Sequence, residues 1–211
     1  MKKAVLSCIC MAVFALDAKA TVYSLAPTPG NLGDLDHNSF LAWGLNWALP
    51  QGETITAATL SFTKIWDWKV EPDALYIHLL DTAPLGVNSW TDNEGGGDFF
   101  ASSLFNSLGI AHVKLAEWSD PFGGNPAKAH NLSFAFNAGQ LTALQGYLNS
   151  AGANGWARFG FGFDPDCHYY NSGVGFNITT VRRSVPEGGS SALLLGMAVG
   201  SIAYLRRKQC V

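Results

Sequence analysis

One stretch, residues 162–171, holds the densest group of chemically useful side chains in the sequence. It reads Gly-Phe-Asp-Pro-Asp-Cys-His-Tyr-Tyr-Asn. One residue separates Asp164 from Asp166, so both carboxylates can point at one cation, and Asn171 with backbone carbonyls could complete a calcium-like oxygen shell. The same Asp-Pro-Asp order also forms a turn without any ligand, because Asp bonds nearby amides and Pro fixes its own φ. Both interpretations stay open at this point.

Two residues of this stretch, Cys167 and His168, are ligands that softer metals prefer. A zinc site needs four ligands, and residues 21–184 contain no second cluster of cysteine or histidine. The sequence therefore does not predict zinc. A lone cysteine in an exported domain also cannot form an internal disulfide, so stability must come from packing or a bound ion.

A second acidic cluster reads Asp34-Leu-Asp36-His-Asn38. Its opening resembles a calcium-binding loop, but the EF-hand pattern fails, because Ser39 stands where Gly is required and Leu45 where Glu is required. The two acidic stretches can share one Ca²⁺ only if the fold brings them together. The expected ligands of such an ion are Asp34, Asp36, Asp164, Asp166 and Asn171.

Aromatic residues next to carboxylates suggest a glycan-binding surface. Sugar rings stack on aromatic faces, and a neighbouring carboxylate accepts hydroxyl hydrogen bonds. The candidate ligand-binding residues are Trp66, Asp67, Trp68, Trp90, His168, Tyr169 and Tyr170. The alternative is that Trp66 or Trp68, two residues apart, packs in the core on the face of Leu60 and Phe62.

Catalytic motifs do not appear. The sequence lacks a Gly-x-Ser-x-Gly elbow, a His-Glu-x-x-His helix and a phosphate-binding loop. Cys167 and His168 are adjacent, whereas catalytic partners are normally brought together by the fold. Carboxylate pairs for glycoside hydrolysis need a defined separation in a cleft, which spacing in sequence does not reveal. We expect no enzyme; the alternative is a secreted hydrolase acting on polysaccharide.

The elements that must position these residues are short strands. Apolar residues alternate with polar ones in runs broken by turn residues, which indicates antiparallel pairing. The expected strands are 23–25, 39–49, 54–68, 74–81, 111–118, 130–137, 156–163 and 174–181. Residues 84–98 are expected to form a long loop, residues 99–108 a strand or short helix, and Gln140–Asn149 a helix. This pattern predicts an all-β antiparallel sandwich of jelly-roll type with one short helix; a closed barrel is the nearest competitor.

Both ends of the 211-residue chain differ from this pattern. Lys2-Lys3, the apolar run 4–16 and Ala18-Lys-Ala20 are typical of a secretory signal helix, with cleavage expected between Ala20 and Thr21. Residues 21–184 then form the working domain, which holds all seven tryptophans, 14 acidic and 7 basic residues, so its net charge is −7. Such an acidic surface repels nucleic acid and suits cations or neutral glycans.

The carboxyl end, residues 185–211, has three parts. Val185-Pro186-Glu187 is followed by an uncharged run, 192–205, and then by Arg206-Arg207-Lys208. This order resembles the PEP-CTERM class of bacterial sorting signals, in a form close to its VPDSG-type variant. The resemblance implies a hydrophobic membrane helix that anchors the chain transiently. It also implies the secretion machinery and a processing exosortase as partners, and release to the surface or extracellular matrix of a Gram-negative-type bacterium that makes extracellular polysaccharide.

Within the domain, the alternation Ala58-x-Leu60-x-Phe62 followed by Ala74-Leu-Tyr-Ile-His resembles the opening strands of galactose-binding-like jelly rolls. Modules of that type often hold calcium near their strand ends. We therefore expect an exported, non-catalytic surface or matrix protein that binds glycan or is purely structural, with Ca²⁺ as its stabilising ion.

Overall fold

The computed structural model describes residues 19–92, 96–149, 157–182, 196–199 and 201. Contacts divide the chain into two units, and the unit Ala20–Val181 contains nearly all of the described residues. The signal segment 1–18 lies outside the described residues, as does most of the tail. Ala20 and Thr21, the expected cleavage site, lie in the first strand. Among the described residues no helix is long and apolar enough to span a membrane.

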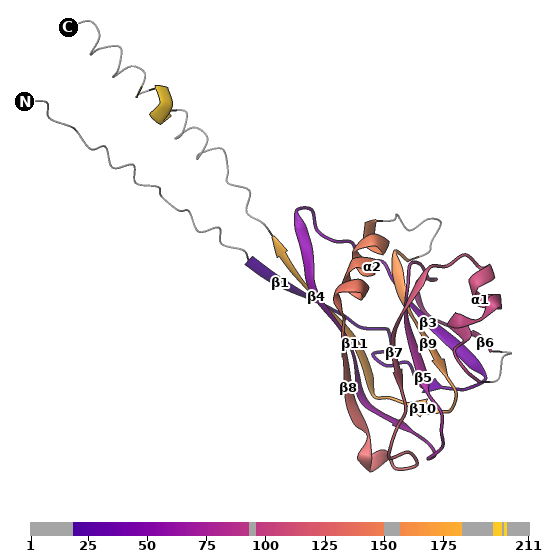
Figure 1. Ribbon diagram of the computed structural model, residues 1–211. Coiled ribbons are helices and arrows are strands. Elements are labelled where there is room, and N and C mark those ends of the chain that lie inside the picture. The colour runs from indigo at the N-terminus through magenta and orange to yellow at the C-terminus, as the bar shows by residue number, and fades with distance from the viewer. Residues whose placement is uncertain (1–18, 93–95, 150–156, 183–195, 200, 202–211) are drawn as a thin grey trace, which may run out of the picture. The chain divides into compact units, whose positions relative to one another are not determined.

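The described strands of this unit form two antiparallel sheets (Figure 1). The six-stranded sheet contains β1 (Lys19–Leu25), β11 (Gly173–Arg182), β4 (Glu53–Asp67), β10 (Tyr169–Tyr170), β2 (Asp34–Leu35) and β8 (His130–Ala135). The five-stranded sheet has the order β6 (Gly86–Thr91), β3 (Ser39–Leu45), β9 (Phe159–Pro165), β5 (Leu75–Leu80) and β7 (His112–Trp118). The predicted all-β antiparallel sandwich is therefore confirmed.

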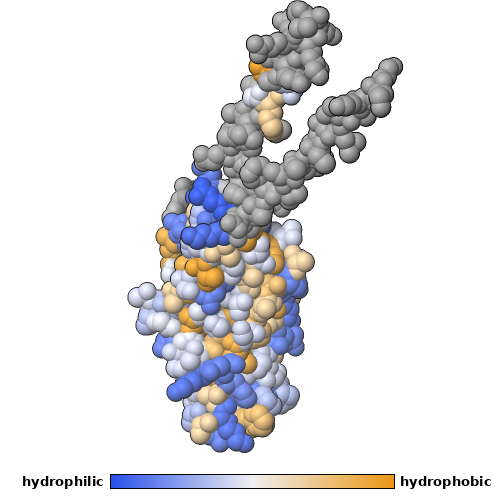
Figure 2. Space-filling model, turned by 90° about the vertical axis from the view of Figure 1, so that its left-hand side faces the viewer, coloured by the Kyte–Doolittle hydropathy of each residue, from blue (hydrophilic) through white to orange (hydrophobic). Residues whose placement is uncertain are grey.

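The main hydrophobic core lies between the sheets. Rings from β9 meet rings from the other sheet: Phe163 lies 5.8 Å from Phe62, and Phe161 lies 4.7 Å from Phe176, centroid to centroid. Glycine alternates with these phenylalanines for a packing reason. A Cβ at Gly162 would lie 2.3 Å from Cζ of Phe100, which covers the opposite face of β9. On the face shown in Figure 2, hydrophobic and hydrophilic residues are interspersed, as is usual for an antiparallel sheet with one side in solvent.

Helical segments occupy the remaining described connections. They are η1 (Phe99–Ala101), α1 (Ser103–Ser107), η2 (Pro126–Lys128) and α2 (Ala138–Asn149). The predicted helix at 140–149 corresponds to α2. Residues 99–108, for which strand and helix were both open, form η1 and α1; the Ser102 hydroxyl caps α1 by accepting from the Phe105 N–H at 3.1 Å. The expected loop at 84–98 contains a strand, β6.

Strand β4 contains a bulge that changes which of its side chains face the core. Its register with β8 shifts between Phe62 and Ile65, and Lys64 has a positive φ of 48°. The irregularity moves the buried positions from even to odd numbers, so Ile65 is buried, Trp66 is half-buried and Trp68 is 51% exposed. Packing of Trp66 or Trp68 on the face of Phe62, the alternative left open by the sequence, is therefore wrong.

Candidate functional site

A two-residue strand, β10, brings three distant stretches together. Tyr170 pairs with Trp66 on β4 and with Asp34 on β2. Because cross-strand partners project to the same side of a sheet, these three side chains share one face. Their neighbours Leu35, Asp67 and Tyr169 project to the other face and are fully buried. The residues expected to bind a ligand are thus divided between the outside and the inside of the sheet.

On the outer face the rings form what we call the aromatic row: Trp66, Tyr170, His168 and Trp68. Trp66 stacks on Tyr170 with centroids 4.9 Å apart and an interplanar angle of 29°. His168 lies nearly parallel to Tyr170 at 6.4 Å, and Trp68 meets His168 edge-on at 5.5 Å. These contacts fix a continuous strip of aromatic surface, the kind of surface on which a sugar ring stacks.

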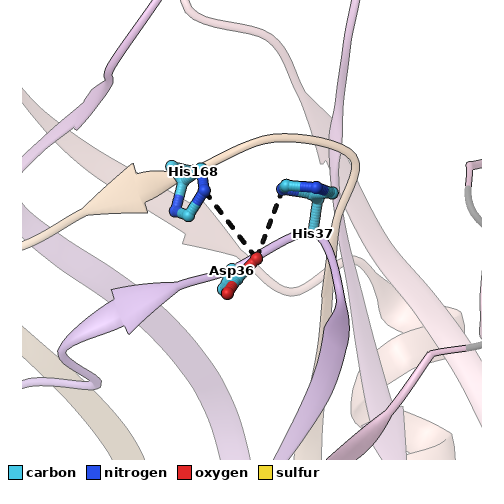
Figure 3. A group of neighbouring side chains, drawn as sticks. All are labelled: Asp36, His37 and His168. Atoms are coloured by element: carbon cyan, nitrogen blue, oxygen red, sulfur yellow. Dashed lines mark ion pairs between the residues drawn. The ribbon is translucent and has the colours of Figure 1, made fainter.

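Two carboxylates and two imidazoles border the row; we call them the Asp–His cluster (Asp34, Asp36, His37, His168). His168 Nδ1 lies 3.0 Å from Asp34 Oδ2. Figure 3 shows His37 and His168 on either side of Asp36, whose Oδ1 lies 3.2 Å from His37 Nδ1 and 3.8 Å from His168 Nε2. His37 was not among the residues expected from the sequence, although it lies between Asp36 and Asn38.

The Asp–His cluster is held in place by its own loop. Asp36 Oδ1 accepts hydrogen bonds at 3.0 Å from the backbone N–H and the side-chain amide of Asn38. The backbone bond is the main cause that lowers the pKa of Asp36. Ligand atoms of Asp36, His37 and His168 lie within 4.8 Å of one another, so they could hold a cation. The same exposed groups can instead accept or donate hydrogen bonds to sugar hydroxyls.

The other expected calcium ligands have different partners. Asp164 Oδ2 accepts the backbone N–H of Phe99 at 2.6 Å, and Asp166 Oδ1 accepts that of Gly97 at 2.7 Å. Burial is the main cause that raises the pKa of Asp164 to about 7; the nearby carboxylates of Asp92, Asp166 and Asp98 act in the same direction, and the hydrogen bond from the Phe99 N–H acts against it. Both side chains therefore hold the segment that leads into η1. Neither belongs to a group of three ligand atoms among the described residues.

Asn171 also fastens a turn. Its Oδ1 accepts the backbone N–H of Leu32 at 3.2 Å, and its Nδ2 donates to the carbonyl of Gly33 at 3.1 Å. The five expected calcium ligands are accordingly distributed over three sets of contacts, and within the described part of the chain no hydrogen bond joins Asp34 or Asp36 to Asp164 or Asp166.

Trp90 belongs to the other sheet. It lies on β6, is 39% exposed and stacks on Phe40 at 5.4 Å. It lines an apolar pocket of about 310 Å³, together with Phe100, Phe105, Leu108 and others. None of the described residues that line this pocket is acidic, so the pocket lacks the facing carboxylates that a glycosidase requires. The pocket was not anticipated, since its walls come from β3, β5, β6 and the 99–110 segment.

Comparison with protein-family models and with curated proteins gives no match. The chemistry of the aromatic row and its neighbours is therefore the basis for assigning a function.

Proposed function

We propose that this chain is an exported surface or matrix protein whose sandwich binds neutral extracellular polysaccharide on the aromatic row without cleaving it. The observation that carries the proposal is the cross-strand alignment of Asp34, Tyr170 and Trp66 on one solvent-facing side. Stacked rings supply apolar contact to sugar faces, while Asp34 and the Asp–His cluster supply hydrogen-bonding groups beside them. The net charge of −7 over residues 21–184 disfavours anionic partners such as nucleic acid.

Export and sorting remain part of the same proposal. The ends at 1–20 and 185–211 are proposed as a signal peptide and an exosortase-processed tail, with Val185, Pro186, Glu187 and the basic group 206–208 as its recognition elements. Mass spectrometry of the surface-exposed protein should find a terminus shorter than Val211. An intact Val211 on surface protein would contradict this part.

The proposal includes a jelly-roll type of sandwich and a calcium ion. Consecutive strands β3, β4 and β5 alternate between the two sheets, which supports a jelly-roll type of connection. For calcium, the geometry favours Asp36 and its neighbour Asp34 over Asp164 and Asp166, because Asp36 belongs to a group of three converging ligand atoms among the described residues, whereas Asp164 and Asp166 do not. Binding should therefore be measured with and without Ca²⁺.

A glycan array, followed by a pull-down on the host's own polysaccharide, tests the function. We expect retention of the wild type and a loss for Trp68→Ala, whose ring is exposed in the row. Trp90→Ala is the matched control, because it removes a tryptophan that is also exposed, 39% against 51% for Trp68, from the other sheet. No retention of the wild type on any glycan, with or without Ca²⁺, would overturn the proposal.

A further inference from the structure

A second group of ligand-type side chains lies beneath the aromatic row. Asp67 ends β4, Asp73 lies in the connection to β5, and Cys167 immediately precedes His168. Their exposed fractions are 0%, 8% and 3%. One ligand atom from each lies within 4.8 Å of the others, so the three converge on a single point inside the protein. Glu71 lies at the edge of this group. We call these four residues the inner cluster.

Each of the two aspartates has one oxygen occupied and one left over. Asp67 Oδ1 accepts the backbone N–H of Lys69 at 3.2 Å, and Asp73 Oδ1 accepts the hydroxyl of Tyr169 at 3.2 Å. Among the described residues, Oδ2 of Asp67 and Oδ2 of Asp73 are buried without any hydrogen-bond partner. Buried acceptors are nearly always satisfied, so two neighbouring unpartnered carboxylate oxygens indicate a missing positive group.

The occupied oxygens resemble the outer contacts of a metal site. In such sites, hydrogen bonds to one atom of a ligand fix its orientation and aim the other atom at the ion. Here the backbone N–H of Lys69 orients Asp67, and the hydroxyl of Tyr169 orients Asp73. For Cys167 the contact is to the ligand atom itself, because the indole N–H of Trp68 donates to Sγ at 3.0 Å.

Glu71 offers a fourth ligand on the solvent side. Its Oε1 lies 3.1 Å from Cys167 Sγ, while its Oε2 lies 2.6 Å from the ammonium of Lys69. The lysine therefore neutralises the outer oxygen of Glu71. Among the described residues, no cationic side chain pairs with the two unpartnered oxygens of Asp67 and Asp73.

The donor set decides which ion fits. Ca²⁺ and Mg²⁺ take oxygen ligands and do not select sulfur, whereas Zn²⁺ and related divalent ions accept thiolate together with carboxylate at four-coordinate sites. We propose that Asp67, Asp73 and Cys167 bind a divalent transition-metal ion of the Zn²⁺ class, with Glu71 as the fourth ligand. The ion ties the β4–β5 connection to Cys167, in the segment that leads into β10, and it does so whether or not the row binds a glycan.

Cobalt is the direct probe, because Co²⁺ bound to thiolate gives a charge-transfer absorption and four-coordinate Co²⁺ gives strong visible bands. The experiment uses the chelator-treated full chain with Cys8, Cys10 and Cys210 replaced by serine. We expect one equivalent of Co²⁺ to give both signals, Zn²⁺ to displace it, and Ca²⁺ or Mg²⁺ to leave the spectrum unchanged. Zn²⁺ should also raise the melting temperature.

Variants separate the inner cluster from the exposed Asp–His cluster. Cys167→Ser should abolish the charge-transfer signal, and Asp73→Asn should weaken Co²⁺ binding at least about tenfold. His37→Gln, which alters the exposed group, should leave the spectrum intact. The proposal is overturned if the wild type gives no charge-transfer signal. In that case the missing positive group is a proton shared by Asp67 and Asp73. The proposal is also overturned if His37→Gln removes the signal while Cys167→Ser keeps it.

Discussion

The two faces of the segment formed by β2, β10 and β4 differ in chemistry, although neighbouring residues of the same three strands supply both of them. Outward from the sheet point Asp34, Tyr170 and Trp66, and inward point Leu35, Tyr169 and Asp67. The outer face has polar groups that are paired and accessible. The inner face has carboxylates with buried, unpartnered oxygens. The comparison shows that one short strand can position a recognition surface and, directly behind it, a site with a wholly different environment.

The largest expected difference between the faces is in stability. Tyr169→Ala removes a fully buried ring that also donates to Asp73, so the free energy of unfolding should fall by about 3–5 kcal/mol. Tyr170→Ala removes an outer ring stacked on Trp66 and should cost about 1 kcal/mol or less. Urea denaturation measures both. Equal losses would show that the two faces are not as different as the burial indicates.

A second prediction concerns the pH dependence of a buried carboxyl outside the inner cluster, Asp164. Burial raises the pKa of Asp164 from its ordinary value of 3.8 to about 7. Between these two pH values the Asp164 carboxyl keeps its proton in the folded state but loses it in the unfolded state. The free energy of unfolding should therefore fall as pH rises from about 4 to about 7. The full shift corresponds to roughly 4 kcal/mol.

Asp164→Asn should flatten this dependence, because the amide oxygen can still accept from the Phe99 N–H but cannot ionise. Melting curves across the pH range provide the measurement. Asp36→Asn is the control, since Asp36 has a lowered pKa and its loss should leave the slope between pH 4 and 7 in place. A variant at Asp164 with the same slope as the wild type would contradict the assignment.

Metal removal should affect the inner face alone. At a free Zn²⁺ concentration about 100-fold above its dissociation constant, binding adds about 2.7 kcal/mol of stability. A chelator should therefore lower the melting temperature of the wild type and of His168→Gln, but not that of Asp67→Asn. A chelator effect that survives in Asp67→Asn would place the ion elsewhere.

Long periodic segments were predictable because many residues report the same pattern. The alternation of Phe159, Phe161 and Phe163 identified β9, and leucines at helical spacing identified α2. The bulge at Lys64 was not predictable, because nothing in the alternation of β4 marks where a residue is inserted. That single irregularity decides that Trp66 faces solvent and Asp67 faces the interior.

The candidate site was predictable in its residue types but not in its grouping. Trp66, His168 and Tyr170 were expected to bind ligand, and β10 does bring them together. A two-residue strand has too little pattern to be seen in sequence, so its pairing with β2 and β4 could not be derived. The part played by Asp73 was missed for the same reason, since only the register of Tyr169 places its hydroxyl at that carboxylate.

Substitutions of the two adjacent tyrosines, Tyr169 and Tyr170, give the most direct test of the proposed recognition surface. Affinity electrophoresis in gels that contain the host polysaccharide compares Tyr170→Ala with Tyr169→Phe, two substitutions at adjacent positions on opposite faces. We predict that Tyr170→Ala weakens binding about tenfold or more, the usual effect of removing a central aromatic contact, and that Tyr169→Phe migrates like the wild type. The assignment of glycan binding to the aromatic row would be contradicted if the polysaccharide retarded Tyr170→Ala as strongly as the wild type. It would also be contradicted if a folded Tyr169→Phe were no longer retarded.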